Sequence, residues 1–454
     1  MKKLFRNSSL LALALAATLS MTSCGQQQPA PVCPPSTVEP AIELIVEPAL
    51  ARIQSVSSQE KKRADLKYLA EEMPKRHSNI YFCTSKEDFE RAVSRLDSQI
   101  PYLTDNQIIV ELMKIVAMTS AQGRDGHTRL SPLQEATGFR IYPLRLYLFS
   151  DGLFVTDALE KYQDSVGARV VGVGNTDVDE AYEALDPLIS RDNAMTVKGN
   201  IAVYFLIPEV LHALGIIDSV DDGEFLFEDV NGERFAMNLA PIQVEDYLSW
   251  VGHIPLTGSE PLYLSNIQEN FWLKFLEDSN TLYIQYNAVA SSTQSIESIL
   301  GFTHRIDEFV NANEVDRVVV DLRHNHGGDR RNYLPLLHVL SENEVINQRG
   351  KLFIIIGRGT FSAAVNFTTD MERNTNTLFV GEPTGGAPNQ SGVLKFLILP
   401  NSNLVVNIGS WYWQESGAND DRLWIAPDIP VELSSEDYFA NRDPVMKAIL
   451  DYKE

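Results

Sequence analysis

The chain has 454 residues, a length that predicts roughly two to four domains. With 44% hydrophobic and 22% charged residues, the composition is that of a globular protein rather than a disordered or collagen-like chain. There are 38 basic and 61 acidic residues, and the net charge of −23 argues against a nucleic-acid binder held by phosphate contacts. Three cysteines are too few for a disulfide framework.

Residues 1–23 resemble an export signal, since a basic start precedes a short apolar run. The run ends in Met-Thr-Ser-Cys-Gly, which resembles the cleavage box of a bacterial lipoprotein, with Cys24 as the lipidated residue. A plain secretory signal is the alternative. We therefore expect an exported, membrane-anchored lipoprotein of the bacterial cell envelope, with residues 24–57 as lipidated tether. In an oxidising compartment Cys33 and Cys83 are able to pair, which the sequence does not decide.

The next two segments differ in their apolar pattern. Apolar residues recur at helical spacing over much of 58–135, which predicts an N-terminal helical cap. Residues 136–260 change to short β-rich runs. Within them, 166–173 followed by a helix loosely resembles the end of a PDZ domain, a module that captures chain ends by adding them to a strand. A β-rich spacer without a ligand is an equal alternative.

The remainder, 261–454, alternates strands and helices, which predicts an α/β layer with parallel strands. Its expected strands are 282–286, 318–322, 352–356 and 378–380, and its expected helices are 296–310, 334–340 and 363–373. A hairpin is expected to follow, with strands 393–399 and 404–408.

Ser362 follows one of the apolar strands through a Gly-rich connection and opens an expected helix. A hydroxyl at a helix N-terminus lies beside unpaired backbone amides, which favour the negative charge that develops on an acyl-transfer intermediate. Serine is also a preferred N-cap residue, so Ser362 alone suits a structural cap as well as a nucleophile. The spacing departs from the G-x-S-x-G elbow of α/β-hydrolases, because Ala364 replaces the second glycine.

A polar cluster, 321–329, follows another strand with the sequence Asp-Leu-Arg-His-Asn-His-Gly-Gly-Asp. Paired glycines let backbone amides approach a ligand closely, so Gly327 or Gly328 is a candidate for one half of an oxyanion hole. The amide of Ala363 is the candidate for the other half. A metal site is the alternative, although no H-E-x-x-H or comparable signature accompanies it. Its potential ligands are Asp321, His324, His326 and Asp329.

His127 lies near the end of the helical cap, in the sequence Gly-Arg-Asp-Gly-His-Thr-Arg-Leu. Histidine is the usual general base for a serine nucleophile. A lone histidine in a polar loop is also often simply solvated.

Together these segments resemble the tail-specific or C-terminal processing protease family of serine peptidases, particularly its branch with the tricorn core and the interphotoreceptor retinoid-binding protein. Segment 359–364 resembles the family's nucleophile segment, 321–329 its D-x-R-x-N-x-G-G segment and 125–128 its D-G-H-T motif. Segments 381–386 and 426–431 match further family landmarks in the same order.

The family divides according to its general base. One branch uses a lysine, and here Ala387 takes that place, so the resemblance implies the branch in which His127 is the base. In that branch a carboxylate orients the system. Asp421 is the nearest match, with Asp420 and Glu415 as rivals.

The resemblance implies a ClpP/crotonase-like catalytic domain and gives each residue a role. Ser362 attacks a peptide carbonyl, His127 takes and returns the proton, and Asp421 holds the imidazole. No metal or cofactor is required. Because the base and the nucleophile come from different predicted domains, we expect the site at a domain interface.

The expected function is that of an exported serine endopeptidase that cleaves unfolded or C-terminal peptide segments. The principal alternative is a non-catalytic lipoprotein on the same scaffold that binds peptides or apolar ligands, as the retinoid-binding relatives of the family do. A metallohydrolase is the third hypothesis.

Overall fold

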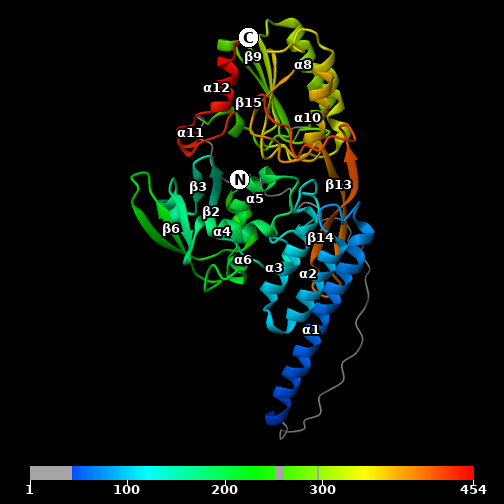
Figure 1. Cartoon of the computed structure of the whole chain (residues 1–454). Helices are drawn as coiled ribbons and strands as arrows, with labels where there is room; N and C mark the ends of the chain where they lie inside the picture. The colour runs from blue at the N-terminus through cyan, green and yellow to red at the C-terminus, as the bar shows by residue number, and fades with distance from the viewer. Residues whose placement is uncertain (1–42, 252–259, 294–295, 454) are drawn as a thin grey trace, which may run out of the picture.

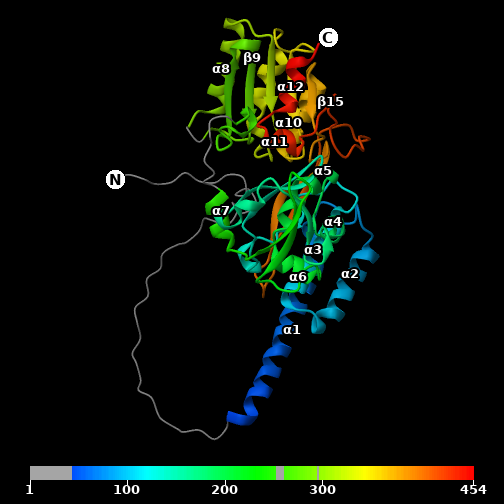
Figure 2. The ribbon, with the colours of Figure 1, turned by 90° about the vertical axis from the view of Figure 1, so that its left-hand side faces the viewer.

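The computed structural model describes residues 43–251, 260–293 and 296–453. Figure 1 shows two lobes, one containing the N-terminal helices and a β-rich module, the other an α/β layer. The hairpin formed by β13 (Asn389–Ile398) and β14 (Val405–Gln414) runs between them, and α1 (Glu43–Arg76) extends away from the body of the molecule (Figures 1 and 2).

The N-terminal cap is helical, as the apolar spacing indicated. Its helices are α1 (Glu43–Arg76), α2 (Lys86–Gln99) and α3 (Asp105–Ala117). The side chain of Ser85 accepts the amide of Asp88 at the start of α2, and Thr104 and Gln107 form a capping box at the start of α3. These caps satisfy amides that a helix leaves free at its first turn, so the sequence fixes where both helices begin.

The β-rich module consists of one main sheet with small helices around it. The sheet has the order β2-β3-β4-β6-β7, and β5 pairs with β4. The strands of this sheet are β2 (Leu144–Phe149), β3 (Gly152–Ala158), β4 (Arg169–Val173), β5 (Thr176–Asp177), β6 (Gly223–Glu228) and β7 (Arg234–Leu239). The short strand β1 (Arg129–Leu130) belongs to a different sheet, with β14 and β13. The helices are α4 (Val178–Leu185), α5 (Ala194–Tyr204), α6 (Pro208–Ala213) and α7 (Val244–Val251). One hydrophobic cluster runs from Leu66 in the cap to Tyr247 in the module, so the two share a core.

The second lobe has the expected parallel sheet, with one antiparallel edge strand that the sequence pattern did not indicate. The sheet order is β15-β12-β11-β10-β9-β8, and β8 is antiparallel to β9. The strands are β8 (Phe271–Leu276), β9 (Thr281–Tyr286), β10 (Arg317–Asp321), β11 (Leu352–Ile356), β12 (Leu378–Gly381) and β15 (Ile429–Pro430). The helices are α8 (Ile299–Ala312), α9 (Leu334–Glu342), α10 (Ala363–Asn374), α11 (Ser435–Phe439) and α12 (Pro444–Asp451).

Helices cover both faces of this sheet, which explains its unbroken apolar strands. In β11, Ile354 belongs to the cluster that contains residues of α8, α9 and α10, whereas Phe353 and Ile355 belong to the cluster with α12. A strand buried on both faces reads as a continuous apolar run rather than an alternating one. The carboxyl ends of β10 and β11 lead into the two segments that contain the candidate glycines and Ser362.

The hairpin β13 (Asn389–Ile398) and β14 (Val405–Gln414) is longer than predicted and joins a separate sheet with the order β1-β14-β13. Its apolar residues Leu397 and Val406 pack in the core of the N-terminal lobe. The predicted peptidase segment 261–454 therefore contributes a hairpin to the other lobe. This contact anchors the lobes to each other.

Within the described ranges, no helix has the length and apolar character needed to cross a membrane. The predicted signal, Cys24 and Cys33 lie outside the described residues. Cys83 is a buried free thiol that donates to the carbonyl of Gly123 at 3.2 Å.

Candidate active site

Ser362 occupies a sharp turn between β11 and α10. Its backbone has φ 55° and ψ −127°, a left-handed conformation that is uncommon for a residue with a side chain. Ser362 stands at the N-cap position of α10, yet its side chain makes no capping hydrogen bond. The hydroxyl of Ser362 therefore does not cap α10.

The hydroxyl instead contacts the imidazole of His127. Ser362 Oγ and His127 Nε2 are 3.0 Å apart, although 235 positions separate the residues in the sequence. The ring of His127 also stacks on Phe361, with 4.6 Å between ring centroids. Burial lowers the pKa of His127 to about 4, and the charge of Asp125 partly opposes this effect. The imidazole is therefore neutral at pH 7 and able to accept the serine proton.

The loop that carries His127 is held by a buried histidine–carboxylate hydrogen bond that sequence reasoning missed. His77 Nδ1 accepts the amide of Asn79, so Nε2 donates to Asp125 Oδ2 at 2.6 Å. The other oxygen of Asp125 accepts the amide of Thr128. His77 was assigned no role from the sequence, because only folding brings the end of α1 beside the D-G-H-T motif.

Asp192, from the β-rich module, supports the same loop from behind. This fully buried carboxylate accepts the amide of Gly126 at 2.6 Å through Oδ1 and the amide of Ala387 at 3.2 Å through Oδ2. Burial raises its pKa to about 7, and the nearby Asp125 adds to the shift. Asp192 thus links Gly126, which precedes His127, to Ala387, which stands where one branch of the resembled family has a lysine. No motif in the sequence indicated it.

Among the candidate oxyanion residues, Gly327 lies beside Ser362 and Ala363. A Cβ on Gly327 would lie 2.7 Å from Ser362 Cβ and 2.8 Å from the amide nitrogen of Ala363, and Gly327 has φ 99°. Only glycine fits this position. The amide of Gly327 donates to Asn325 Oδ1 at 2.9 Å, which leaves Gly328 as the better second donor. Ala363 begins α10, so its amide has no acceptor within the helix.

Asn325 organises this glycine segment. Its side chain donates to the carbonyl of Tyr286 at 2.8 Å, and its own carbonyl accepts the amide of Phe361 at 3.1 Å. A single buried asparagine therefore links β9, the glycines and the residue before the nucleophile.

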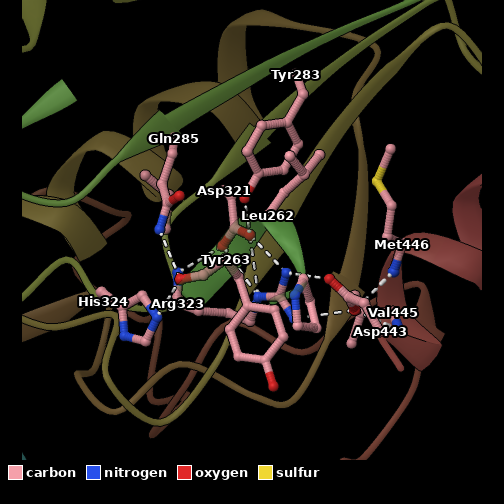
Figure 3. Close-up of polar contacts among 12 residues, drawn as sticks. Leu262, Tyr263, Tyr283, Gln285, Asp321, Arg323, His324, Asp443, Val445 and Met446 are labelled. Atoms are coloured by element: carbon pink, nitrogen blue, oxygen red, sulfur yellow. Dashed lines mark hydrogen bonds and ion pairs between the residues drawn. The ribbon is translucent and has the colours of Figure 1, made fainter. Parts of the chain in front are cut away.

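The Asp and Arg of the D-x-R segment build structure rather than contact Ser362 (Figure 3). Arg323 donates to both Asp321 and Asp443, and its guanidinium lies 4.2 Å from the centroid of the Tyr263 ring. Burial disfavours the charged form of Asp321, but Arg323 outweighs it and lowers the pKa of that carboxyl. Asp443 also caps α12. The network fixes the C-terminal helix against the end of β10.

The residues proposed as metal ligands are dispersed. Asp321 is taken by Arg323 and Tyr283, and His324 contacts the carbonyl of Tyr263 at 2.8 Å. Asp329 is exposed and binds Arg331. In the part of the chain that the structure describes, no three acidic, histidine or cysteine side chains gather in a metal-binding arrangement.

The expected orienting carboxylate is not in place. Asp421 is exposed to solvent, and His127 Nδ1 is buried with no hydrogen-bond partner among the described residues. Of the rivals, Asp420 binds Arg422 and Ser416. Glu415 pairs with Arg330. The structure therefore does not support the assignment of Asp421, because the segment before the P-D motif turns its acids toward arginines and solvent.

Further ion pairs join the lobes next to the nucleophile loop. Arg358 donates to Glu382 at 2.6 Å and to the carbonyl of Leu148 in β2, and Lys198 in α5 also binds Glu382. Burial alone disfavours the charge of Glu382, but Arg358 and Lys198 lower its pKa overall. The predicted location of the site between lobes matches this arrangement, in which each lobe supplies one of the two contacting side chains.

No family model matches the chain, and no curated protein matches it at the sequence level. Several solved structures are similar to it. Mature CPAF has 12% sequence identity and a TM-score of 0.60, over 87% of this chain and 98% of that chain. Mature CPAF complexed with lactacystin has 13% identity and a TM-score of 0.60, over 86% and 97%. The photosystem II D1 C-terminal processing protease has 13% identity and a TM-score of 0.38, over 83% and 94%.

These similarities extend over nearly the whole length of the CPAF chain, so they concern both lobes and not the α/β layer alone. The expected α/β fold with a helical cap and a β-rich module is confirmed. The chain has the fold of mature CPAF.

Proposed function

We propose that the protein is a serine endopeptidase that cleaves unfolded or C-terminal peptide segments. The observation that carries the proposal is the 3.0 Å contact between Ser362 Oγ and His127 Nε2, made across two lobes at the start of α10. A strained, non-capping serine at a helix N-terminus beside a neutral buried imidazole is the arrangement that serine acyl transfer requires. A structural serine has no need of the strain or of the histidine.

In the proposed mechanism, Ser362 attacks the peptide carbonyl while His127 takes its proton. The amides of Ala363 and Gly328 stabilise the oxyanion, and each such donor is worth on the order of a hundredfold in rate. His127 then protonates the leaving amine and later activates the water that hydrolyses the acyl enzyme. Since no carboxylate bonds to Nδ1, the field of Asp125 supplies the nearby negative charge that favours the imidazolium.

The substrate proposal rests on the location of the site and on the family resemblance. Because Ser362 and His127 come from different lobes, we propose that the peptide binds between the lobes, which favours extended, unfolded segments over folded domains. A structure of CPAF carries lactacystin, and we propose that this chain's serine also reacts with such acylating inhibitors.

The test is labelling of the purified protein with a fluorophosphonate, followed by mass spectrometry of the modified peptide. We expect one adduct, on Ser362, that is lost in Ser362→Ala and strongly reduced in His127→Ala. Ser298 is a matched control, because it also stands at a helix N-cap but does cap, accepting the amide of Gly301 at 3.1 Å. Ser298→Ala should keep full labelling. An unlabelled native protein would favour the non-catalytic binding protein.

We also propose that the protein is exported and anchored by a lipid on Cys24. The support is the basic and apolar signal pattern of residues 1–23 and the small residues before the cysteine. Cys24→Ser should move the protein from the membrane fraction to the soluble fraction, whereas Cys33→Ser should not. The same distribution for Cys24→Ser and the native chain would contradict the anchor.

A further inference from the structure

The hairpin presents large apolar side chains to solvent. Leu394, Phe396 and Ile398 alternate along β13 and therefore share one face, and Phe396 and Ile398 are 45% and 56% exposed. Val393 at the start of this stretch and Trp411 in β14 are also exposed. We call these five residues the hairpin face.

Packing within the described chain does not account for the hairpin face. The opposite side of the hairpin, with Leu397, Val406 and Ile408, already fills the core of the lobe. β13 ends its sheet, and among the described residues no strand pairs with its outer edge. Exposed apolar edge strands promote unwanted association, and proteins usually protect them with charges or proline. Here Lys395 is the one charged residue of β13.

The hairpin face is continuous with the candidate active site. Gln390, at the start of β13, donates to the carbonyl of Ser362 at 3.4 Å, and Ser391 donates to the carbonyl of Arg124 in the loop of His127. At about 3.3 Å per residue, the eight steps from Gln390 to Ile398 cover roughly 26 Å. At Ser391 the loop of Arg124 occupies the backbone amide of β13, so an extended chain that leaves the site has room along β13 only after this residue, where it meets the exposed apolar side chains.

The backbone bends where the buried start of β13 becomes the exposed strand. Val393 has φ 53°, which is a genuine outlier for a β-branched residue. Such strain persists only where the surrounding structure enforces it, and it concentrates at ligand sites. The bend lies where the buried start of β13 ends, and Leu394 and Phe396 after it are exposed.

We propose that the hairpin face binds an extended, apolar segment of the substrate polypeptide on one side of the scissile bond. This inference rests on the proposed peptidase function and names a substrate preference for it. An extended polypeptide supplies both main-chain groups for a free strand edge and alternating side chains for an apolar face. Apolar contact also suits an acidic protein with a net charge of −23, since it does not depend on the sign of the substrate charge.

Two measurements test the inference with the double variant Phe396→Ser, Ile398→Ser. The first is kcat/KM for a short fluorogenic peptide and for the same peptide extended on either side by eight residues, apolar or Ser-rich. We expect an apolar extension on one side to raise kcat/KM about tenfold in the native protein, and the double variant to lose this gain but to cleave the short peptide normally. Val230→Ser, an equally simple change at a residue that is 89% exposed, is the control.

The second measurement is binding of the apolar peptide to Ser362→Ala, with and without the double change, by fluorescence anisotropy. We expect the double change to weaken binding of the apolar peptide about tenfold, which would support the hairpin face as a binding site. If this result is found but no peptide is cleaved, only the peptidase proposal fails. Three results would overturn the inference. The apolar peptide could bind Ser362→Ala equally well with and without the double change, or the double variant could lose as much activity toward the short peptide as toward the extended one. The native protein could also be a dimer that the double change dissociates.

Discussion

Asp192 offers the most direct test of the electrostatics behind the candidate base. Its carboxylate is completely buried, yet it faces two backbone amides and no cation among its hydrogen-bond partners. Replacing it by asparagine removes the titratable group and keeps the size of the side chain. One amide, at Gly126 or Ala387, would then face an NH2 group instead of an oxygen, which costs about 1–3 kcal/mol at every pH.

The pH-dependent part of the effect follows from the pKa. The carboxyl titrates at about 7 in the folded protein and at about 3.8 in the unfolded chain. Between these values the folded state holds a proton that the unfolded state has released, so stability falls as pH rises. Over roughly three pH units at about 1.4 kcal/mol each, the native protein should lose about 4 kcal/mol of stability, with no further loss from this group above pH 7.

The assay is urea denaturation between pH 4 and 8 of the native protein and of Asp192→Asn. We expect the free energy of unfolding of the native protein, relative to the variant, to fall by about 4 kcal/mol from pH 4 to 7. Asp421→Asn, at an exposed position, should follow the native protein throughout. Parallel curves for native and Asp192→Asn protein would refute the reasoning, because they would mean that Asp192 titrates alike in both states.

Three other predictions concern the site itself. The acidic limb of kcat/KM should have its midpoint near pH 4, because burial lowers the His127 pKa and the base becomes active as pH rises through that value; a midpoint near 6.5 would contradict the burial argument. Gly327→Ala should lower kcat at least a hundredfold with an unchanged circular dichroism spectrum, since its Cβ would meet Ser362 and Ala363 below 3.0 Å. His77→Ala should reduce the unfolding free energy by about 1–3 kcal/mol by leaving Asp125 Oδ2 without its donor, whereas His304→Ala, at an exposed residue, should have little effect.

Sequence reasoning succeeded where chemistry and local pattern coincide. The apolar runs of β10 and β11, and the glycines and serine that follow them, predicted both a parallel sheet and a site at its carboxyl edge. The approach of His127 to Ser362 followed only from the family resemblance, because nothing local brings together residues 235 positions apart. Asp192 and His77 had no local signal, since their roles depend on backbone amides and loops that meet them after folding.

The hairpin shows a second limit of local patterns. The strands were expected from their apolar residues, but the pattern does not tell which apolar residues are buried. Leu397 is in the core, while its neighbours Phe396 and Ile398 are exposed, and this difference depends on which face of the strand meets the N-terminal lobe.

The imidazole of His127 is oriented without a carboxylate bonded to Nδ1. Stacking on Phe361 fixes the plane of the ring, and Asp192 fixes the backbone just before it through Gly126. Orientation is thus achieved by packing and by the main chain, and the charge of Asp125 remains to stabilise the protonated ring. Because His127 and Phe361 belong to different lobes, a shift of one lobe against the other would alter both the stacking of the ring and the Ser362–His127 contact.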